Sequence, residues 1–350
     1  LFRPGAPHIQ EFYQGHRDKI ACAAVHGSKK LVATGEAAVS PRIHVWLAGS
    51  LRTVSVIRTG HAAGIMTMRF ACRGALLFSV GVDRHFSLQA SDWRTGRTVA
   101  FRHTGTEKIV ELASDPQKPE FFATSSIGCV DLWRLRCNAI EHRARVALGD
   151  SSVRRSGVLA TALEFLPFSV GGKNKQALLV GDASGKLGVV TNKRYRVVFD
   201  DAAKAGLVAV IRVAETSDGP LVFVVRGSTV LTLDLNFRPT AFKIELKQNS
   251  RVQSLDLFAC ESPTSVLLGT AEGQVFMTQR GEELKRLFVA HAAQPLLAPS
   301  LGDFAKCRRI HIAASKKQGV IASAGDDKIL RFWSVKENML IKEVLLPFVP

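Results

Sequence analysis

A turn, a short alternating strand and a closing tryptophan recur along the whole of this chain. The clearest copy is the run GDDKILRFW, which begins at Gly325 and ends at Trp333. Four of the six intervals between successive copies match the period of about 40–45 residues that is typical of one four-stranded blade of a β-propeller. The closing position is filled in turn by Trp46, Ser91, Trp133, Val190, Leu233, Thr278 and Trp333.

Seven copies in one register predict an all-β fold, a seven-bladed WD40-type β-propeller. Short apolar runs such as 31–34 and 76–80 fit its strands, because a blade packs against its neighbours on both faces. The two longer intervals require insertions. We place one at 147–156 together with 169–175, and the other at 294–306.

The repeat also sets the expected domain boundaries. Residues 14–336 should form the seven-bladed WD40-like propeller. Residues 1–13 form an N-terminal segment that is one candidate for the ring-closing strand. Residues 337–350 should form a C-terminal strand that closes the ring or starts a further unit, and the sequence does not decide between these. Because Arg212 interrupts the best apolar stretch, we expect no transmembrane helix.

Gly-His pairs open the first two blades, and Ala290-His291 occupies the same place in the last. In WD40 blades such a histidine joins a strand Ser or Thr, a turn Asp and the Trp in one hydrogen-bonded chain. We therefore interpret these side chains as structural staples of the blades and not as ligands or bases. The predicted staples are His16, His61, His291, Ser323, Asp83, Asp327, Trp46, Trp133 and Trp333.

The sequence contains no recognisable active-site pattern. It lacks G-x-S-x-G, H-E-x-x-H and G-x-G-x-x-G, and the GDASGK run at 181–186 is one residue short of a phosphate loop. The six cysteines form no Cys-x-x-Cys pair, which favours a reducing compartment. We predict a non-enzymatic protein with no catalytic residue, metal or cofactor. Further histidines are spread over different blades without a recurring acidic partner: His26, His44, His85, His103, His142 and His311.

The formal net charge of +17 is the extreme value of the composition. Such a balance favours an acidic partner: nucleic acid, an anionic membrane or an acidic protein surface. In a propeller, the loops between the first and second strands (A–B) and between the third and fourth strands (C–D) share one face. We expect this A–B/C–D face to bind the partner through Lys29, Lys30, Arg73, Arg94, Arg97, Lys118, Arg134, Arg136, Lys173, Lys175, Lys193, Arg194, Arg238, Arg280, Lys316, Lys317 and Lys336.

Blade 1 carries a more specific pattern. The run YQGH at 13–16 precedes VATGE at 32–36 and SPRIHVW at 40–46. DLW at 131–133 and IHIAASKK at 310–317 extend the pattern to later blades. These segments resemble the echinoderm microtubule-associated protein-like family. The resemblance implies binding to tubulin or microtubules and a cytoplasmic, cytoskeletal location that includes cilia or flagella.

Charge and resemblance together predict a scaffold propeller that docks on tubulin or microtubules through its basic face. The alternative is an RNA- or ribonucleoprotein-associated WD40 scaffold, which the charge alone supports equally well. Nucleic acid is therefore the second choice of partner, and no membrane partner is expected.

Overall fold

The structure is a computed structural model. The residues that it describes are 13, 15–28, 30–105, 107–149, 158–167, 176–201, 206–216, 219–246, 250–258, 265–271, 274–278, 284–289, 311–315, 320–324, 329–334 and 339–345. The predicted insertions at 169–175 and 294–306, and most of the one at 147–156, lie outside these residues.

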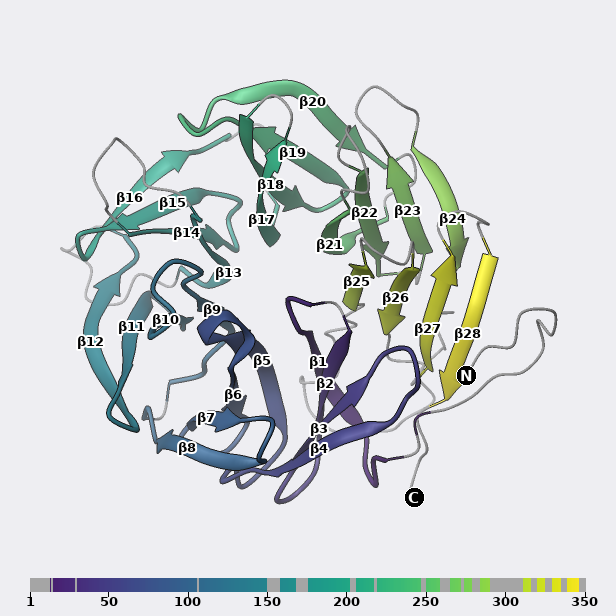
Figure 1. Cartoon of the computed structure of the whole chain (residues 1–350). Helices are drawn as coiled ribbons and strands as arrows, with labels where there is room; N and C mark the ends of the chain where they lie inside the picture. Colours follow the sequence, from purple (N-terminus) through teal and green to yellow (C-terminus); the bar gives the residue numbers. More distant parts are fainter. Residues whose placement is uncertain are drawn as a thin grey trace, which may run out of the picture.

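The described residues form seven four-stranded sheets that are arranged as a ring (Figure 1). Each sheet is antiparallel and is built from four consecutive strands, the first of which lies nearest the centre of the ring. The prediction of a seven-bladed WD40-type propeller is therefore confirmed.

Blades 1 to 4 lie in the N-terminal part of the chain. Their strands are β1 (Ile20–Val25), β2 (Leu31–Glu36), β3 (Arg42–Leu47), β4 (Thr53–Arg58), β5 (Ile65–Ala71), β6 (Leu76–Gly81), β7 (Leu88–Asp92), β8 (Arg97–Arg102), β9 (Glu111–Ser114), β10 (Phe121–Ser125), β11 (Cys129–Arg136), β12 (Ala139–Ala147), β13 (Ala160–Phe165), β14 (Ala177–Asp182), β15 (Leu187–Thr191) and β16 (Arg194–Phe199). A 3-10 turn, Cys72–Gly74, joins β5 to β6.

Blades 5 to 7 follow in the same pattern. Their strands are β17 (Val208–Thr216), β18 (Gly219–Arg226), β19 (Thr229–Leu233), β20 (Pro239–Glu245), β21 (Val252–Phe258), β22 (Ser265–Thr270), β23 (Gln274–Thr278), β24 (Lys285–Val289), β25 (His311–Ser315), β26 (Val320–Ala324), β27 (Ile329–Ser334) and β28 (Met339–Leu345). Because β28 pairs with β27, the C-terminal segment supplies the outer strand of blade 7. Residues 1–12 of the N-terminal candidate lie outside the described residues.

The strand ladders place the seven closing positions in one structural register. Each closing residue on the third strand pairs with an apolar residue on the second strand of its blade. The same slot therefore accepts Trp, Ser, Val, Leu or Thr while the backbone pairing stays constant. The apolar partners are Val32, Leu77, Phe122, Leu178, Val222, Val266 and Ile321.

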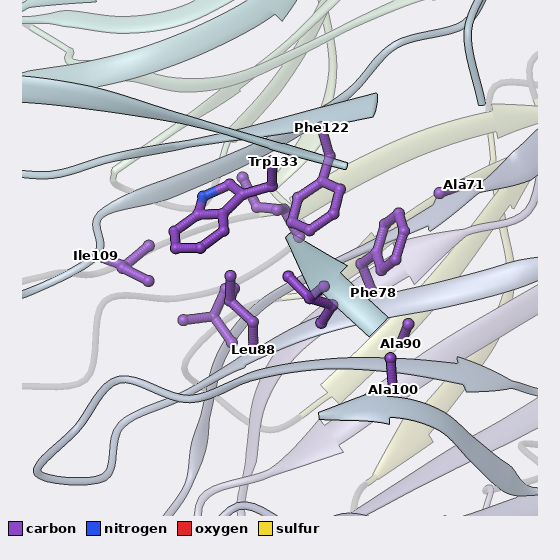
Figure 2. Packing of buried hydrophobic residues seen from close by; sticks show 11 residues of the cluster. Ala71, Phe78, Leu88, Ala90, Ala100, Ile109, Phe122 and Trp133 are labelled. Atoms are coloured by element: carbon purple, nitrogen blue, oxygen red, sulfur yellow. The ribbon is translucent and has the colours of Figure 1, made fainter. Parts of the chain in front are cut away.

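The core consists of apolar layers between neighbouring blades. Figure 2 shows the layer between blades 2 and 3, where Phe78 stacks on Phe122 at a centroid distance of 4.4 Å and Trp133 lies beside them. Burial on both sheet faces explains why the second strands are buried along their length, as in β14 and β22, where all six residues are buried. Tyr13 and Trp46 of the first blade pack with Phe332 of the last, so the same kind of layer closes the ring. Within the described part of the chain, no helix is long and apolar enough to cross a membrane.

Candidate functional site

Blade 1 contains a buried polar chain that begins at its tryptophan. Trp46 Nε1 donates to Thr34 Oγ1 at 3.1 Å, and Thr34 Oγ1 lies 2.6 Å from His16 Nε2. His16 Nδ1 donates to Glu36 Oε1 at 3.0 Å, because a carboxylate can only accept. Burial lowers the pKa of His16, so the neutral ring accepts the Thr34 hydroxyl proton at Nε2. In blade 1, a glutamate at the end of β2 thus provides the carboxylate of the chain.

A second arm reaches the same glutamate, and sequence reasoning missed it. The Tyr13 hydroxyl lies 3.0 Å from Thr53 Oγ1 and 2.8 Å from His44 Nδ1, while His44 Nε2 lies 3.5 Å from Glu36 Oε1. His44 therefore has a carboxylate close by, which the sequence alone did not indicate. Tyr13 also stacks on Trp46, which fixes its ring.

Glu36 is the charged centre of this cluster. Burial opposes its ionisation, but hydrogen bonds from His16 and from the backbone N–H of Arg42, together with the adjacent imidazole of His44, hold its pKa well below the usual range. Nδ1 of His16, Nε2 of His44 and the carboxylate lie within 4.8 Å of one another, a spacing that a metal ion could use. However, His16 and Glu36 are already engaged in hydrogen bonds, which favours a structural role for the cluster.

Blade 2 holds its histidine by a different set of hydroxyls. His61 Nε2 lies 2.8 Å from Ser79 Oγ, and His61 Nδ1 lies 2.6 Å from Ser87 Oγ. The Ser87 hydroxyl in turn donates to the Asp83 carboxylate, so Ser87 links the histidine to the aspartate. Ser91 fills the closing slot, and Trp93 lies beyond the end of the strand.

Blade 3 keeps the tryptophan but departs from the rest of the pattern. Trp133 Nε1 donates to Thr124 Oγ1 at 2.9 Å, as Trp46 does to its threonine. The buried Asp131 lies next to this pair and accepts from Arg145 at 2.9 and 3.0 Å and from His142 at 2.8 Å. His142 thus has an acidic partner that differs from the Glu36 neighbour of His44.

The predicted staples of blade 7 are only partly described. Trp333 is buried in β27, and Ser323 belongs to β26. His291, Asp327 and the side chain of Ser323 lie outside the described residues.

The A–B/C–D face carries exposed bases in each of blades 1 to 5. Lys29, Lys173, Lys175, Arg280, Lys316, Lys317 and Lys336 lie outside the described residues. Arg52, which the sequence analysis did not select, is exposed in the C–D loop of blade 1 and adds to this set. The predicted bases that are exposed at this end of the blades are Lys30, Arg73, Arg94, Arg97, Lys118, Arg136, Lys193, Arg194 and Arg238.

Four of the predicted bases lie in strands and not in loops: Arg97 is the first residue of β8, and Arg194 is the first residue of β16. Arg134 and Arg136 belong to β11. Arg134 is half-buried, lies 3.7 Å from the Glu120 carboxylate and covers the ring of Phe121 at 5.2 Å. Arg134 is thus less available to a partner than we expected, because the ion pair and the aromatic contact already hold its guanidinium.

The first two blades are fastened together on this face. The Gly74 carbonyl accepts from Trp93 Nε1 at 2.7 Å and lies 3.2 Å from His26 Nε2. Gly74 has a φ of +84°, and a Cβ there would lie 2.0 Å from His26 Nε2, so only glycine fits. The Arg94 guanidinium lies 4.4 Å from the centre of the Trp93 ring, which holds this base at the surface.

Acidic side chains in the described loops of this face are used within the protein. The Asp234 carboxylate accepts the backbone N–H groups of Asn236 and Arg238 at 2.8 Å, and the buried Asp115 caps its own turn in the same way. These carboxylates shape the turns, while the basic side chains extend into solvent. The opposite face is mixed, and its Lys186 and Asp200 pair at 2.9 Å.

The innermost strands carry charged residues of both signs. Arg69 NH2 lies 3.5 Å from Glu111 Oε1, and Arg212 NH1 lies 3.4 Å from Glu164 Oε2. Burial raises the pKa of Glu164, although the guanidinium groups of Arg212 and Arg69 oppose this. These residues neutralise one another.

Comparison with solved structures supports the fold, whereas comparison with known sequences gives only partial matches. No family model matches the chain. The Saccharomyces cerevisiae Sqt1 structure superposes with a TM-score of 0.67 at 12% identity, covering 95% of this chain and 87% of that one. The Dos1 propeller gives a TM-score of 0.65 at 14% identity, with coverages of 96% and 86%.

Sequence relatives match only part of the chain. Mouse echinoderm microtubule-associated protein-like 2 is 26% identical over 145 residues, which is 38% of this chain and 22% of that protein. Human WD repeat-containing protein 90 is 30% identical over 138 residues, which is 36% of this chain and 8% of that protein. The matched segments thus span less than a quarter of these relatives. The chain is a seven-bladed β-propeller of the WD40 type, with partial similarity to both of these proteins.

Proposed function

We propose that this propeller is a protein-interaction scaffold that binds tubulin or microtubules through its A–B/C–D face. The observation that carries the proposal is the run of exposed bases across blades 1 to 5 of that face, beside carboxylates that are used in turns. The partial similarity to a microtubule-associated protein-like protein points to the same partner.

Electrostatic docking fits the way these bases are presented. They are exposed side chains at the blade ends, so each contributes a modest attraction of about 0.2–1 kcal/mol to an acidic surface. Their sum is long-ranged, because the Debye length is about 30 Å at 0.01 M ionic strength and about 10 Å at 0.1 M. Binding should therefore be strong at low salt and weaken steeply as salt rises.

Co-sedimentation with stabilised microtubules tests this proposal. We expect the wild-type chain to pellet at low ionic strength. The triple substitution Arg73→Glu, Arg94→Glu and Lys118→Glu should weaken binding at least tenfold, roughly the effect of reversing three exposed charges.

A matched control separates the face from net charge. Arg17, Arg84 and Arg251 are exposed on the opposite face, and their replacement by Glu changes the formal charge by the same amount. The control triple should pellet like the wild type. No pelleting at low salt, or equal losses in both triples, would refute the proposal. Filter binding to structured RNA with a steep salt dependence, without pelleting, would favour the nucleic-acid alternative.

A further inference from the structure

Blade 3 contains a cavity at the end where blades 1 and 2 hold their staple histidines. Its volume is about 160 Å³. This is below the roughly 300–1,000 Å³ of pockets for drug-sized ligands, so one side chain or a small ring is the appropriate size of occupant. The lining residues are Thr104, Gly105, Glu107, Ile109, Thr124, Ser126, Asp131, Trp133 and Arg145.

The cavity repeats the two polar contacts that hold an imidazole in blade 1. There, Thr34 contacts one ring nitrogen of His16 and Glu36, two residues later, contacts the other. In blade 3, the strand pairing puts Thr124 at the position of Thr34, and Ser126 follows two residues later. Thr124 and Ser126 both line the cavity, so two hydroxyl residues occupy the register positions whose counterparts hold the imidazole in blade 1; we call this pair the cradle.

The sequence explains why this cradle has no histidine of its own. Blades 1 and 2 open with Gly15-His16 and Gly60-His61, whereas blade 3 opens with Gly105-Thr106. Thr106 itself lies outside the described residues. Trp133 still donates a hydrogen bond to the Thr124 hydroxyl, as Trp46 does to Thr34. The Trp–Thr part of the hydrogen-bonded staple is therefore present in blade 3 without a histidine.

The charges of the lining favour a donor of N–H groups. Glu107 and Asp131 outnumber Arg145, and the Glu107–Arg145 ion pair at 3.1 Å is about half exposed, which places it at the mouth. The Ser126 hydroxyl contacts Cys129 Sγ at 2.9 Å and can still accept from a ligand. A planar ring with two nitrogens satisfies both hydroxyls beside the Trp133 indole.

We propose that this blade 3 cavity binds the histidine side chain of a partner protein, which completes the missing staple in trans. The site lies away from the A–B/C–D face and does not depend on the microtubule proposal. It gives the scaffold a second docking point that recognises one imidazole.

Free imidazole and N-acetyl-histidine methylamide are the probes. Binding is followed on the full chain by the indole N–H resonance of Trp133, which is assigned with Trp133→Phe. We expect a saturable shift with a dissociation constant of about 1 mM. Pyrrole, which has one nitrogen, should bind more weakly, because it can engage only one hydroxyl.

Two variants and one control substitution test the proposal. Ser126→Ala should weaken imidazole binding about five- to tenfold, the effect of one lost hydrogen bond. Thr106→His restores the Gly-His dipeptide that opens blades 1 and 2, so it should raise the melting temperature and abolish binding; Ser126→Ala carries the test alone if this variant does not fold. Thr98→Ala, which removes an exposed hydroxyl of β8, should bind as the wild type does. Absence of a saturable shift, equal affinity for pyrrole, or full binding by Ser126→Ala would overturn the proposal.

Discussion

The buried imidazole of blade 2 should make the propeller sensitive to mild acid. The His61 side chain is fully buried, and burial lowers its pKa to about 4, although the Asp83 carboxylate opposes this. In the unfolded chain its pKa is about 6.5. Between about pH 6.5 and pH 4, His61 is therefore protonated in the unfolded state but neutral in the folded state. The free energy of unfolding decreases as pH falls through this range.

The two pKa values set the size of the effect. Between pH 7 and pH 5, His61 alone should remove about 2 kcal/mol from the free energy of unfolding. His16 contributes in the same direction, because burial also lowers its pKa. The assay is urea unfolding followed by tryptophan fluorescence at both pH values, on the wild type and on His61→Gln.

His61→Gln separates the titration of His61 from that of the other groups. His61→Gln cannot titrate, so it should lose about 2 kcal/mol less than the wild type over this pH range. Ser79→Ala removes a hydrogen-bond partner of the ring but keeps the buried imidazole, so it should be less stable at pH 7 and keep the pH dependence. Equal acid sensitivity in His61→Gln and the wild type would refute this reasoning.

Three further substitutions test the blades by equilibrium unfolding. Trp46→Phe removes the donor to Thr34 and opens space in the layer that closes the ring, so it should cost about 2–4 kcal/mol; a smaller cost than that of an exposed-site control would contradict the staple. Gly181→Ala places a Cβ 2.3 Å from Val208 of the next blade and should cost about 1–3 kcal/mol by overpacking; an unchanged midpoint would show that the two blades separate readily. Asp131→Asn replaces the carboxylate that accepts from Arg145 and His142, and should lower the free energy of unfolding by about 1–3 kcal/mol at pH 7. The loss should shrink at high salt, and a stabilised variant would show that these contacts do not stabilise blade 3.

The recurring pattern was enough to predict the fold. The closing position recurs once in every blade, for example at Trp46, Ser91 and Trp133, and so marks one local four-stranded unit. Each unit has two apolar faces that only neighbouring units can cover. The number of copies therefore gives the number of blades. The same logic predicted a structural role for His16 and for His61 from one dipeptide each.

Tertiary structure decided what lies beside these residues. Tyr13, His44 and Glu36 come from three separate segments, and only the folding of blade 1 brings them into one buried cluster. The Asp131–Arg145 pair likewise joins two strands whose register no local motif specifies.

The sequence by itself determined the periodic backbone, because strand and turn preferences act between residues that are close along the chain. The tertiary structure decided which polar groups are in contact and where a cavity remains, because these depend on how side chains from distant strands pack together. Gly105-Thr106 marks the absence of a histidine in blade 3, but only the packed sheet shows that Thr124 and Ser126 still line the space that an imidazole would occupy.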